Sequence, residues 1–417
     1  MAATASFSRG NDSSFAADSA GLQQALQLLL SASPSDANSA GTLPSNLPET
    51  GLGESATLDL IAPVILGGAR RLNAPDALAH MDPPTPWIAW ATTLWNAALN
   101  QNLLHPDVAP VARDVEARVV NWLTPHFGMD GGHMTPGSTV ANLTALWTAR
   151  EVRGIRKVIA SEGSHLSIAK AAHLLGLDYV AIPTDAQGRM LPDALPSGYD
   201  DACLVLTAGT TSAGAVDPLE LAGCAAWTHV DAAWAGPLRL SDQHAAVLQG
   251  IENADSVSVS AHKWFFQPKE SALIFFRNTT EAHPAISFGG AYLAVPNIGL
   301  LGSHGAVAVP LLATLLAWGR AGLAERIDRT MAVAQALHER LSAHPKIEVF
   351  GPATTGVVLW KLATEEATLR TFADLPDGSV SKTGLRGEMW LRNVAANPNV
   401  DLERLWPKME QAASKAG

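Results

Sequence analysis

Between about residue 128 and residue 280, short apolar runs alternate with segments whose apolar positions recur at helical spacing. Strand–helix alternation with almost continuously apolar strands is typical of a mainly parallel sheet covered by helices on both faces. We therefore predict an α/β domain around such a sheet, of the seven-stranded type. The predicted strands are 157–160, 179–183, 203–207, 228–230, 256–259 and 272–276, and helices at 140–150 and 167–175 separate several of them.

The pattern changes on the N-terminal side of this domain. Residues 1 to about 55 are rich in Ser, Ala, Asn, Gly and Pro, which predicts an arm with one helix at 22–30. Helical segments follow from residue 57. Trp87, Trp90 and Trp95 lie among alanines there, and we interpret such a tryptophan cluster as core, with substrate contact as the less favoured reading.

The pattern also changes after Gly302. A helical stretch at 306–343 precedes short strands at 347–350, 355–362 and 388–392 and a final helix at 402–415, which Pro407 starts or kinks. This ending predicts a small α+β domain. We expect an N-terminal arm and helical segment at 1–100, a large domain at 101–305 and a small C-terminal domain at 306–417.

Composition narrows the class of protein. The 417 residues are 47% hydrophobic and 16% charged, which argues against general disorder. The net charge of −11 disfavours nucleic acid or an anionic membrane as a partner. Cys203 and Cys224 alone form neither a disulfide framework nor a four-thiolate zinc site, and we expect no metal.

Hydropathy gives no sign of secretion or of membrane insertion. The first thirty residues hold one basic residue, Arg9, and no uninterrupted apolar core, so we expect no secretory signal. The apolar stretch 307–318 is broken by Pro310 and is too short to span a bilayer. We expect a soluble, cytoplasmic protein.

The strongest chemical motif is SAHKW at 260–264, directly after a buried strand. Lys263 stands between aromatic and apolar neighbours, where a charged ammonium group is unfavourable unless it is paired or exposed. Burial favours the neutral amine, which is a nucleophile able to form an imine with an aldehyde. Taken alone, however, a lysine in this position is more often a solvated side chain.

A second motif, HVDAAW at 229–234, changes that balance. It places Asp231 at the end of an apolar strand, where open α/β sheets bind their ligands. A pyridoxal phosphate site needs an acid that keeps the ring nitrogen protonated. Asp231 and Lys263 are 32 residues apart, enough for a crossover and a return strand, although Asp231 could also be a simple turn residue.

Two further segments carry polar groups suited to such a site. The sequence GGHMTPGST at 131–139 predicts a glycine-rich loop that opens a helix, and backbone amides and hydroxyls at a helix N-terminus form an anion cradle. His165 follows the strand at 157–160, and an imidazole can stack on an aromatic ring and handle protons. Each signal is weak alone, since Ser and Thr are ordinary helix caps and a lone His is usually structural.

Together these motifs resemble one family, the group II pyridoxal-phosphate-dependent amino-acid decarboxylases of the aspartate-aminotransferase fold (fold type I). The resemblance rests on TPGST, SEGSHLSIAKAA, LTAGTTSAGAVDPL, HVDAAW and SVSAHKWFFQP and covers roughly residues 100 to 320. It implies a homodimer with shared active sites and an amino acid, a small molecule, as the substrate. It also implies a mechanism in which loss of the α-carboxylate leaves a quinonoid that is then protonated and released as an amine.

The resemblance assigns a role to each site residue. Lys263 would be the internal Schiff-base lysine and Asp231 the partner of the pyridine nitrogen. His165 would stack on the ring and face the substrate, with Ala233 under the other face. The remaining cofactor contacts would be Ser138, Thr139 and His262 at the phosphate, Thr207 near the ring oxygen or Asp231, and Gly302 and Ser303 at the phosphate of the neighbouring subunit.

The chain departs from the family pattern in three places. Val140 stands where the phosphate loop usually carries a glutamate, and His304 with Gly305 replaces frequent arginines. The decarboxylases also carry a tyrosine on a mobile loop that protonates the intermediate. Here 294–301 has none, and Tyr292 is the candidate catalytic tyrosine although it aligns with a pocket tyrosine ahead of that loop. Members without the loop tyrosine can form an aldehyde by oxidative deamination.

Several alternative functions remain open. An aminotransferase would bind the substrate carboxylate through an arginine such as Arg392, which could equally form a surface ion pair. A cysteine desulfurase needs a mobile thiol, and Cys203 lies in a predicted core strand. A cofactor-binding protein without catalysis would not need to retain Lys263. The sequences SIAK at 167–170 and KTG at 382–384 match two serine β-lactamase motifs, but the third motif is absent.

The substrate pocket gives mixed indications. Trp87 and Phe288 suggest an apolar wall, whereas His80 and Asp82 could contact a polar or basic side chain. The sequence therefore does not separate an aromatic from a small polar amino acid. His80 and Arg392 are the candidate substrate-binding residues.

Overall fold

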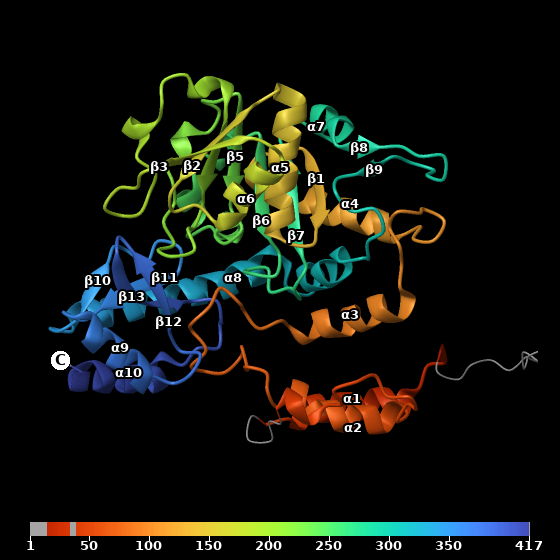
Figure 1. Ribbon diagram of the computed structural model, residues 1–417, viewed down its shortest axis with the longest axis horizontal. Helices are drawn as coiled ribbons and strands as arrows, with labels where there is room; N and C mark the ends of the chain where they lie inside the picture. The colour runs from red at the N-terminus through yellow and green to blue at the C-terminus, as the bar shows by residue number, and fades with distance from the viewer. Residues whose placement is uncertain (1–14, 34–38, 417) are drawn as a thin grey trace, which may run out of the picture. The chain divides into compact units, whose positions relative to one another are not determined.

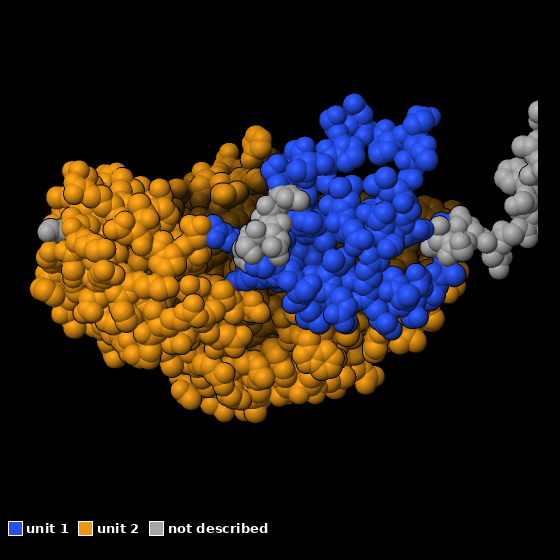
Figure 2. All heavy atoms as spheres, turned by 90° about the horizontal axis from the view of Figure 1, so that it is seen from below, with its two compact units in different colours: residues 1–71 blue, residues 72–417 orange. Residues whose placement is uncertain are grey.

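The computed structural model describes residues 15–33 and 39–416 and divides the chain into two compact units, Met1–Arg71 and Leu72–Gly417 (Figure 2). The first unit contains α1 (Ser19–Ser31) and α2 (Glu54–Ile65), which pack on each other. Gln24 joins them, because its side-chain amide donates to Asp59 at 2.9 Å and accepts from the Ser55 hydroxyl at 2.9 Å. The helix expected at 22–30 is confirmed; other parts of the predicted arm, at 1–14 and 34–38, lie outside the described residues.

The second unit is built around a seven-stranded sheet of order β1-β7-β6-β5-β4-β2-β3 (Figure 1). All its neighbouring strands run parallel except β7, which is antiparallel to both β6 and β1. The predicted mainly parallel sheet is therefore confirmed. Its strands are β1 (Gly131–Thr135), β2 (Lys157–Ser161), β3 (Asp178–Ile182), β4 (Cys203–Thr207), β5 (Trp227–Asp231), β6 (Ser256–Ser260) and β7 (Ala272–Phe276).

One strand of this sheet corrects the sequence analysis. The predicted loop at 131–139 is wrong for its first five residues, which form β1 and pair with β7. Gly132 faces the β7 backbone so closely that a Cβ there would lie 2.0 Å from the Ile274 carbonyl oxygen. Gly132 thus serves the close approach of two strands, and only the residues after Thr135 remain as a loop before α5 (Ser138–Arg153).

Both faces of the sheet are buried, as its apolar strands predict. In β7, Leu273 and Phe275 belong to one core and Ile274 and Phe276 to the other, because side chains alternate along a strand. The helices α5, α6 (Leu166–Leu174) and α7 (Thr279–Ala285) accompany the second core. The helices α4 (Ala112–Leu123) and α8 (Ala308–Ala343) contribute to the first.

The C-terminal part forms a second, antiparallel sheet of order β10-β11-β13-β12, covered by two helices. Its elements are β10 (Glu348–Phe350), β11 (Val357–Lys361), α9 (Glu365–Asp374), β12 (Ser381–Leu385), β13 (Glu388–Val394) and α10 (Leu402–Ala416). The predicted α+β character is confirmed, but β12 was not predicted. It is an edge strand of sequence SKTGL, which lacks the apolar alternation that identifies a strand. It also contains the KTG sequence noted above.

A long helix and a short hairpin lie in the chain between the large sheet and the C-terminal sheet. The long helix α8 is interrupted at Gly319, whose φ of +62° is outside the helical range. A short hairpin of β8 (Ser287–Phe288) and β9 (Asn297–Ile298) lies between α7 and α8. None of the helices within 15–33 and 39–416 combines the length and the apolarity needed to cross a membrane.

Helix α3 (Trp87–Leu99) contradicts the interpretation of its tryptophans as core. Trp87 and Trp95 are 71% and 60% exposed, and Trp90 is also exposed. The helix packs on α8, and its own buried residues are the small Ala89 and Thr92. Ala89 and Thr92 rather than the tryptophans therefore form the packed face, and the aromatic side chains lie on the opposite side.

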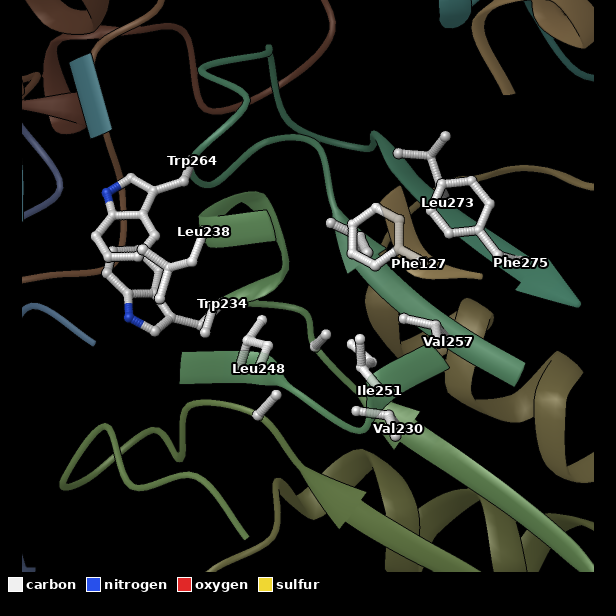
Figure 3. Packing of buried hydrophobic residues seen from close by; sticks show 14 of the residues in the cluster. Phe127, Val230, Trp234, Leu238, Leu248, Ile251, Val257, Trp264, Leu273 and Phe275 are labelled. Carbon is white, nitrogen blue, oxygen red and sulfur yellow. The ribbon is translucent and has the colours of Figure 1, made fainter. Parts of the chain in front are cut away.

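A stacked pair of tryptophans joins the two sheets. Trp234 and Trp264 are buried with ring centroids 4.1 Å apart, and Figure 3 shows the two rings one above the other. Both indole nitrogens donate to carbonyl groups of the C-terminal part: Trp234 to Thr355 at 2.7 Å and Trp264 to Ala395 at 3.2 Å. The pair therefore fixes the loops after β5 and β6 against the second sheet.

Two glycines let the backbone approach this pair. Gly209 has a φ of +97°, and a Cβ on it would lie 2.8 Å from the Trp234 ring. Gly356 has a φ of +74°, and a Cβ on it would lie 3.1 Å from the Trp264 ring. Any other residue at these positions would strain the backbone and displace an indole.

We expect Trp264→Ala to lower the free energy of unfolding by about 3–5 kcal/mol, because it removes a buried indole and leaves a cavity. The measurement is urea denaturation followed by far-ultraviolet circular dichroism. Leu174→Ala, at an exposed position on α6, is the control and should change the value by no more than about 0.5 kcal/mol. Equal effects of the two changes would contradict a structural role for the pair.

Candidate active site

A cavity of about 350 Å³ lies where β4, β5 and β6 reach their carboxyl ends and α5 begins. This edge of an open α/β sheet is where ligands bind. The cavity brings together eight residues that the sequence analysis proposed from separate motifs. They are Ser138, Thr139, His165, Thr207, Asp231, Ala233, His262 and Lys263.

Lys263 is the only lysine among the residues that line this cavity. Burial lowers the pKa of its ammonium group, while the carboxylates of Asp231 and Asp82 act in the opposite direction. The charges of Lys269 and Arg392 lower it further. The balance increases the share of neutral amine, which is the form that attacks a carbonyl carbon.

Asp231 is buried at the end of β5 and is surrounded by donors. It accepts from the Asn142 side-chain amide at 2.9 Å and from the Ala233 backbone at 3.1 Å, and the Ser258 hydroxyl, which donates to Asn142, lies 3.3 Å away. A buried carboxylate is stable only with such partners. These bonds hold it at the cavity wall.

Sequence reasoning missed Asn142 and His229. Asn142 is fully buried on α5, and it also lies 3.0 Å from His229 through its side-chain oxygen. A usable signal was present, because position 142 follows Ser138 by one helical turn and therefore faces the same way. His229 was visible only as part of HVDAAW, and its buried position on β5 could not be read from the motif.

His165 caps the start of α6. Its Nδ1 lies 2.8 Å from the Ser167 hydroxyl and accepts from the Ser167 backbone N–H at 3.2 Å. Burial lowers the pKa of the imidazole, and Asp231 raises it in part. The ring is therefore biased towards its neutral form beside the cavity.

The start of α5 and the ends of β4 and β6 offer hydroxyl groups that suit an anion. Among the residues that the structure describes, no hydrogen-bond partner meets the buried hydroxyls of Ser138, Thr207 and Ser260. Ser138 opens a helix of 16 residues, whose N-terminus favours negative charge. The pKa of His262 is lowered to about 4, mainly by burial and in addition by the nearby charges of Lys269 and Lys263. Its imidazole is therefore neutral at pH 7.

These groups fit pyridoxal phosphate. The cofactor requires an amine for its aldehyde, a carboxylate for its ring nitrogen and donors for its phosphate. Lys263, Asp231 and the unpartnered hydroxyls supply all three at one cavity. No group of three or more His, Cys, Asp or Glu side chains in the described ranges is arranged to hold a metal ion.

Five predicted site residues lie outside this cavity, four of them exposed and the fifth, Arg392, buried. Tyr292 is 74% exposed between β8 and β9, and Gly302, Ser303 and His80 are also exposed. Ser303 accepts a hydrogen bond from Asn102 at 3.2 Å. One copy of the chain does not bring these four exposed residues to the cavity, so their roles stay predictions.

Arg392 is buried in β13 near the cavity, although it is not part of the wall. One of its terminal nitrogens donates to the Ser381 hydroxyl at 3.3 Å, and its Nε has no partner within the described part of the chain. Burial lowers the pKa of its guanidinium to about 10, opposed by Asp82. Asp82 itself forms an ion pair with Lys269.

The two thiols lie apart from this chemistry. Cys203 is buried in β4, where burial raises its pKa, and Cys224 is exposed. Neither thiol lines the cavity around Lys263. A reactive cysteine of the desulfurase type therefore has no place at this site.

Known proteins resemble the chain in sequence and in fold. A family model described as the pyridoxal-dependent decarboxylase conserved domain matches residues 37–363. The chain is 32% identical over 396 residues to L-2,4-diaminobutyrate decarboxylase of Rhizobium meliloti (strain 1021). This alignment covers 84% of this chain and 80% of that protein. It is 25% identical over 415 residues to aromatic-L-amino-acid decarboxylase of Bacillus atrophaeus, covering 87% and 85%.

The solved structures agree on the fold. Oryza sativa TDC, solved with PLP and tryptamine, matches with a TM-score of 0.87 at 22% identity, covering 98% of this chain and 99% of that one. Rhodiola rosea 4-hydroxyphenylacetaldehyde synthase matches with a TM-score of 0.82 at 20% identity, covering 95% and 96%.

These findings confirm the predicted family, the predicted fold class and the predicted cofactor. The family match spans well over half of the chain, including the motifs that meet at the cavity. This protein therefore belongs to the pyridoxal-dependent decarboxylase family, and it is an amino-acid decarboxylase whose cofactor is pyridoxal phosphate.

Proposed function

We propose that the cavity around Lys263 is the active site, at which the chain converts an L-amino acid into carbon dioxide and an amine. The observation that carries this proposal is the meeting of Lys263, Asp231 and three unpartnered hydroxyls at one cavity. These side chains come from motifs that are far apart in the sequence. A binding protein without catalysis would not require a buried, reactive amine among them.

Each wall of the cavity has a distinct task. Pyridoxal phosphate, when bound, supplies an electron-withdrawing ring that stabilises the charge left on the α-carbon as the carboxylate departs. Lys263 holds the cofactor covalently through Nζ, since burial favours its neutral amine. The Asp231 carboxylate keeps a proton on the ring nitrogen. His165 and Ala233, which both line the cavity, would enclose the two faces of the ring.

The phosphate is held by short polar groups. Ser138 and Thr139 donate from the start of α5, and the neutral His262 adds a hydrogen bond rather than an ion pair. Gly302 and Ser303 reach the phosphate of a second copy of the chain. Their exposure in one copy supports this arrangement.

The substrate carboxylate binds to Arg392. This side chain is close enough to Lys263 to affect its pKa, and its Nε has no partner inside the described ranges. An arginine with an unused donor suits a carboxylate. His80 and Asp82 lie on a neighbouring loop and contact the side chain of the substrate. Because a diaminobutyrate decarboxylase is 32% identical, a short polar amino acid such as L-2,4-diaminobutyrate is the first substrate to test.

The active form is a homodimer in which α3 lies at the interface. Large apolar side chains cover its outer face, and an exposed apolar face of this size usually marks a contact with another protein surface. A second copy also supplies the predicted phosphate contacts. The exposed residues of this face are Trp87, Trp90, Leu94, Trp95 and Leu99.

A second candidate product is the aldehyde. The chain has three tyrosines, of which Tyr179 lies in β3 with its hydroxyl 3.1 Å from Ser164, and Tyr292 is exposed. None of the three, Tyr199 included, lines the cavity, so none of them is in place to protonate the α-carbon in one copy. Relatives of this fold include a protein named as an aldehyde synthase, and the fold therefore does not decide the product.

We expect Lys263→Ala to abolish covalent capture of the cofactor. After loading with pyridoxal phosphate and treatment with borohydride, mass spectrometry should find a reduced adduct on the peptide that contains Lys263 in the wild type. Lys269→Ala, which changes an exposed lysine six residues away, should keep that adduct. An adduct on another lysine would contradict the proposed site.

The product is identified by incubating the wild type, Lys263→Ala and Lys269→Ala with L-2,4-diaminobutyrate and with a panel of amino acids. Carbon dioxide with an equal amount of amine supports the proposal, and Lys263→Ala should produce neither. Carbon dioxide with aldehyde, ammonia and hydrogen peroxide would replace it with the second candidate. A keto acid without carbon dioxide would indicate an aminotransferase.

We expect Arg392→Lys to raise the KM of the substrate about tenfold, because it loses one hydrogen bond between charged groups. Steady-state kinetics on the best substrate of the panel measures this, with little change in kcat. Arg329→Lys, at an exposed position on α8, is the matched control and should keep the wild-type KM. An unchanged KM in Arg392→Lys would exclude the carboxylate contact.

We expect Leu94→Glu to split the dimer, because it places a charge in the centre of the apolar face of α3. Light scattering coupled to size exclusion should give two chains for the wild type and one for the variant. Leu174→Glu, at an exposed position on α6, should stay dimeric. A monomeric wild type, or a variant that stays dimeric, would contradict the proposed interface.

A further inference from the structure

The side chain of Asn142, which lies at the wall of the cavity, is the centre of a buried hydrogen-bond network. Its Nδ2 lies 2.9 Å from Asp231 Oδ2 and 2.9 Å from the Ser167 hydroxyl. Its Oδ1 lies 2.6 Å from the Ser258 hydroxyl and 3.0 Å from His229 Nε2. Both donor hydrogens and the acceptor oxygen of the amide are therefore in use in a fully buried position.

The Asp231 carboxylate determines how this amide is oriented. A carboxylate only accepts hydrogen bonds, so the group that faces it must be Nδ2 and not Oδ1. It follows that Oδ1 faces Ser258 and His229 and that both of them donate to it. The opposite orientation would bring two acceptors together in a site without solvent, at a substantial cost.

His229 fits this orientation. Burial lowers its pKa to about 4, so the ring is neutral near pH 7 and carries one proton. Because Nε2 donates to Asn142, Nδ1 accepts from the Ser256 hydroxyl at 2.9 Å. Ser256 in turn accepts from the Trp227 indole at 2.9 Å, and an indole nitrogen can only donate. The donors therefore run in one direction, from Trp227 through to Asn142.

The network continues in the same direction from Asn142 to His165. Ser167 accepts from Asn142 Nδ2, so its own hydrogen is available to His165 Nδ1 at 2.8 Å. The Ser167 backbone N–H also donates to Nδ1, at 3.2 Å. Two donors on Nδ1 require that this atom carries no proton. In a neutral imidazole the proton is then on Nε2.

We propose that Asn142 is a positioning residue, which holds Asp231 in place and, through Ser167, keeps the proton of His165 on Nε2. Nε2 has no hydrogen-bond partner within 15–33 and 39–416, and His165 lines the cavity. The imidazole therefore offers a donor to an anionic group in the cavity and accepts no proton at that atom. This consequence for the reaction rests on the proposed function, whereas the position of the proton does not.

The position of the proton can be measured directly. The full chain, with its histidines labelled with ¹⁵N, is recorded by long-range ¹H–¹⁵N correlation with and without pyridoxal phosphate, and His165→Gln assigns the signals. We expect a protonated Nε2 and an unprotonated Nδ1 for His165 in the wild type. A protonated Nδ1 in the wild type would overturn the proposal, whatever the variants do.

Two variants test the route through Asn142. Asn142→Asp keeps the size but replaces the donor with an acceptor, which draws the Ser167 hydrogen away from His165, and Ser167→Ala removes the hydroxyl. Each should raise the share of the form with the proton on Nδ1 about fivefold, as expected for the loss of one hydrogen bond. Ser164→Ala is the matched control, because that hydroxyl faces Tyr179 at 3.1 Å and should leave the ratio unchanged.

The outcomes separate this inference from the proposed function. An unchanged ratio in both Asn142→Asp and Ser167→Ala would overturn the role of Asn142. If Asn142→Asp does not fold, Ser167→Ala and the wild-type spectrum still decide. A protonated Nε2 in a wild type that decarboxylates no amino acid would support the inference on the tautomer and remove only its link to the reaction.

Discussion

The stacking of Trp234 on Trp264 is the interaction on which the rest of the site depends. One indole follows Asp231 by three residues and the other follows Lys263 directly, so the pair fixes the two loops that carry the carboxylate and the amine. Their nitrogens bind carbonyl groups near the second sheet, and Gly209 and Gly356 give the rings room. The tryptophans of the two motifs therefore help to set the distance between the Asp231 carboxylate and the Lys263 amine, although neither indole takes part in the chemistry.

A second constraint comes from polar groups buried below the cavity. A carboxylate, an amide and an imidazole in an apolar interior are tolerated only when every donor meets an acceptor. Asp231, Asn142 and His229 satisfy this requirement with one consistent direction of hydrogen bonds. By the inference drawn above, the same requirement that stabilises the core also determines which nitrogen of His165 carries the proton. Structural stability and the protonation of a site residue are two results of one network.

The sequence was sufficient for the central sheet and for the motifs of the site, because apolar strands and short motifs around Asp231 and Lys263 are local signals. Prediction from the sequence failed where the structure of a segment depends on contacts with residues far away in the chain. The α3 tryptophans look like core residues until Ala89 and Thr92 are seen to form the packed face. Strand β1 looks like a loop because its glycines accommodate a neighbouring strand. Asn142 resembles any polar helix residue until β5 and α6 bring Asp231 and Ser167 to it.

The carbonyl groups that the indoles bind belong to Thr355 and Ala395, more than a hundred residues after the tryptophans themselves. During synthesis the sheet with Asp231 and Lys263 leaves the ribosome well before these partners exist. The loops around both residues gain their final support only when almost the whole chain has emerged. A chain that stops before residue 355 therefore lacks both carbonyl partners of the indoles, although it contains Asp231, Lys263 and every strand of the large sheet.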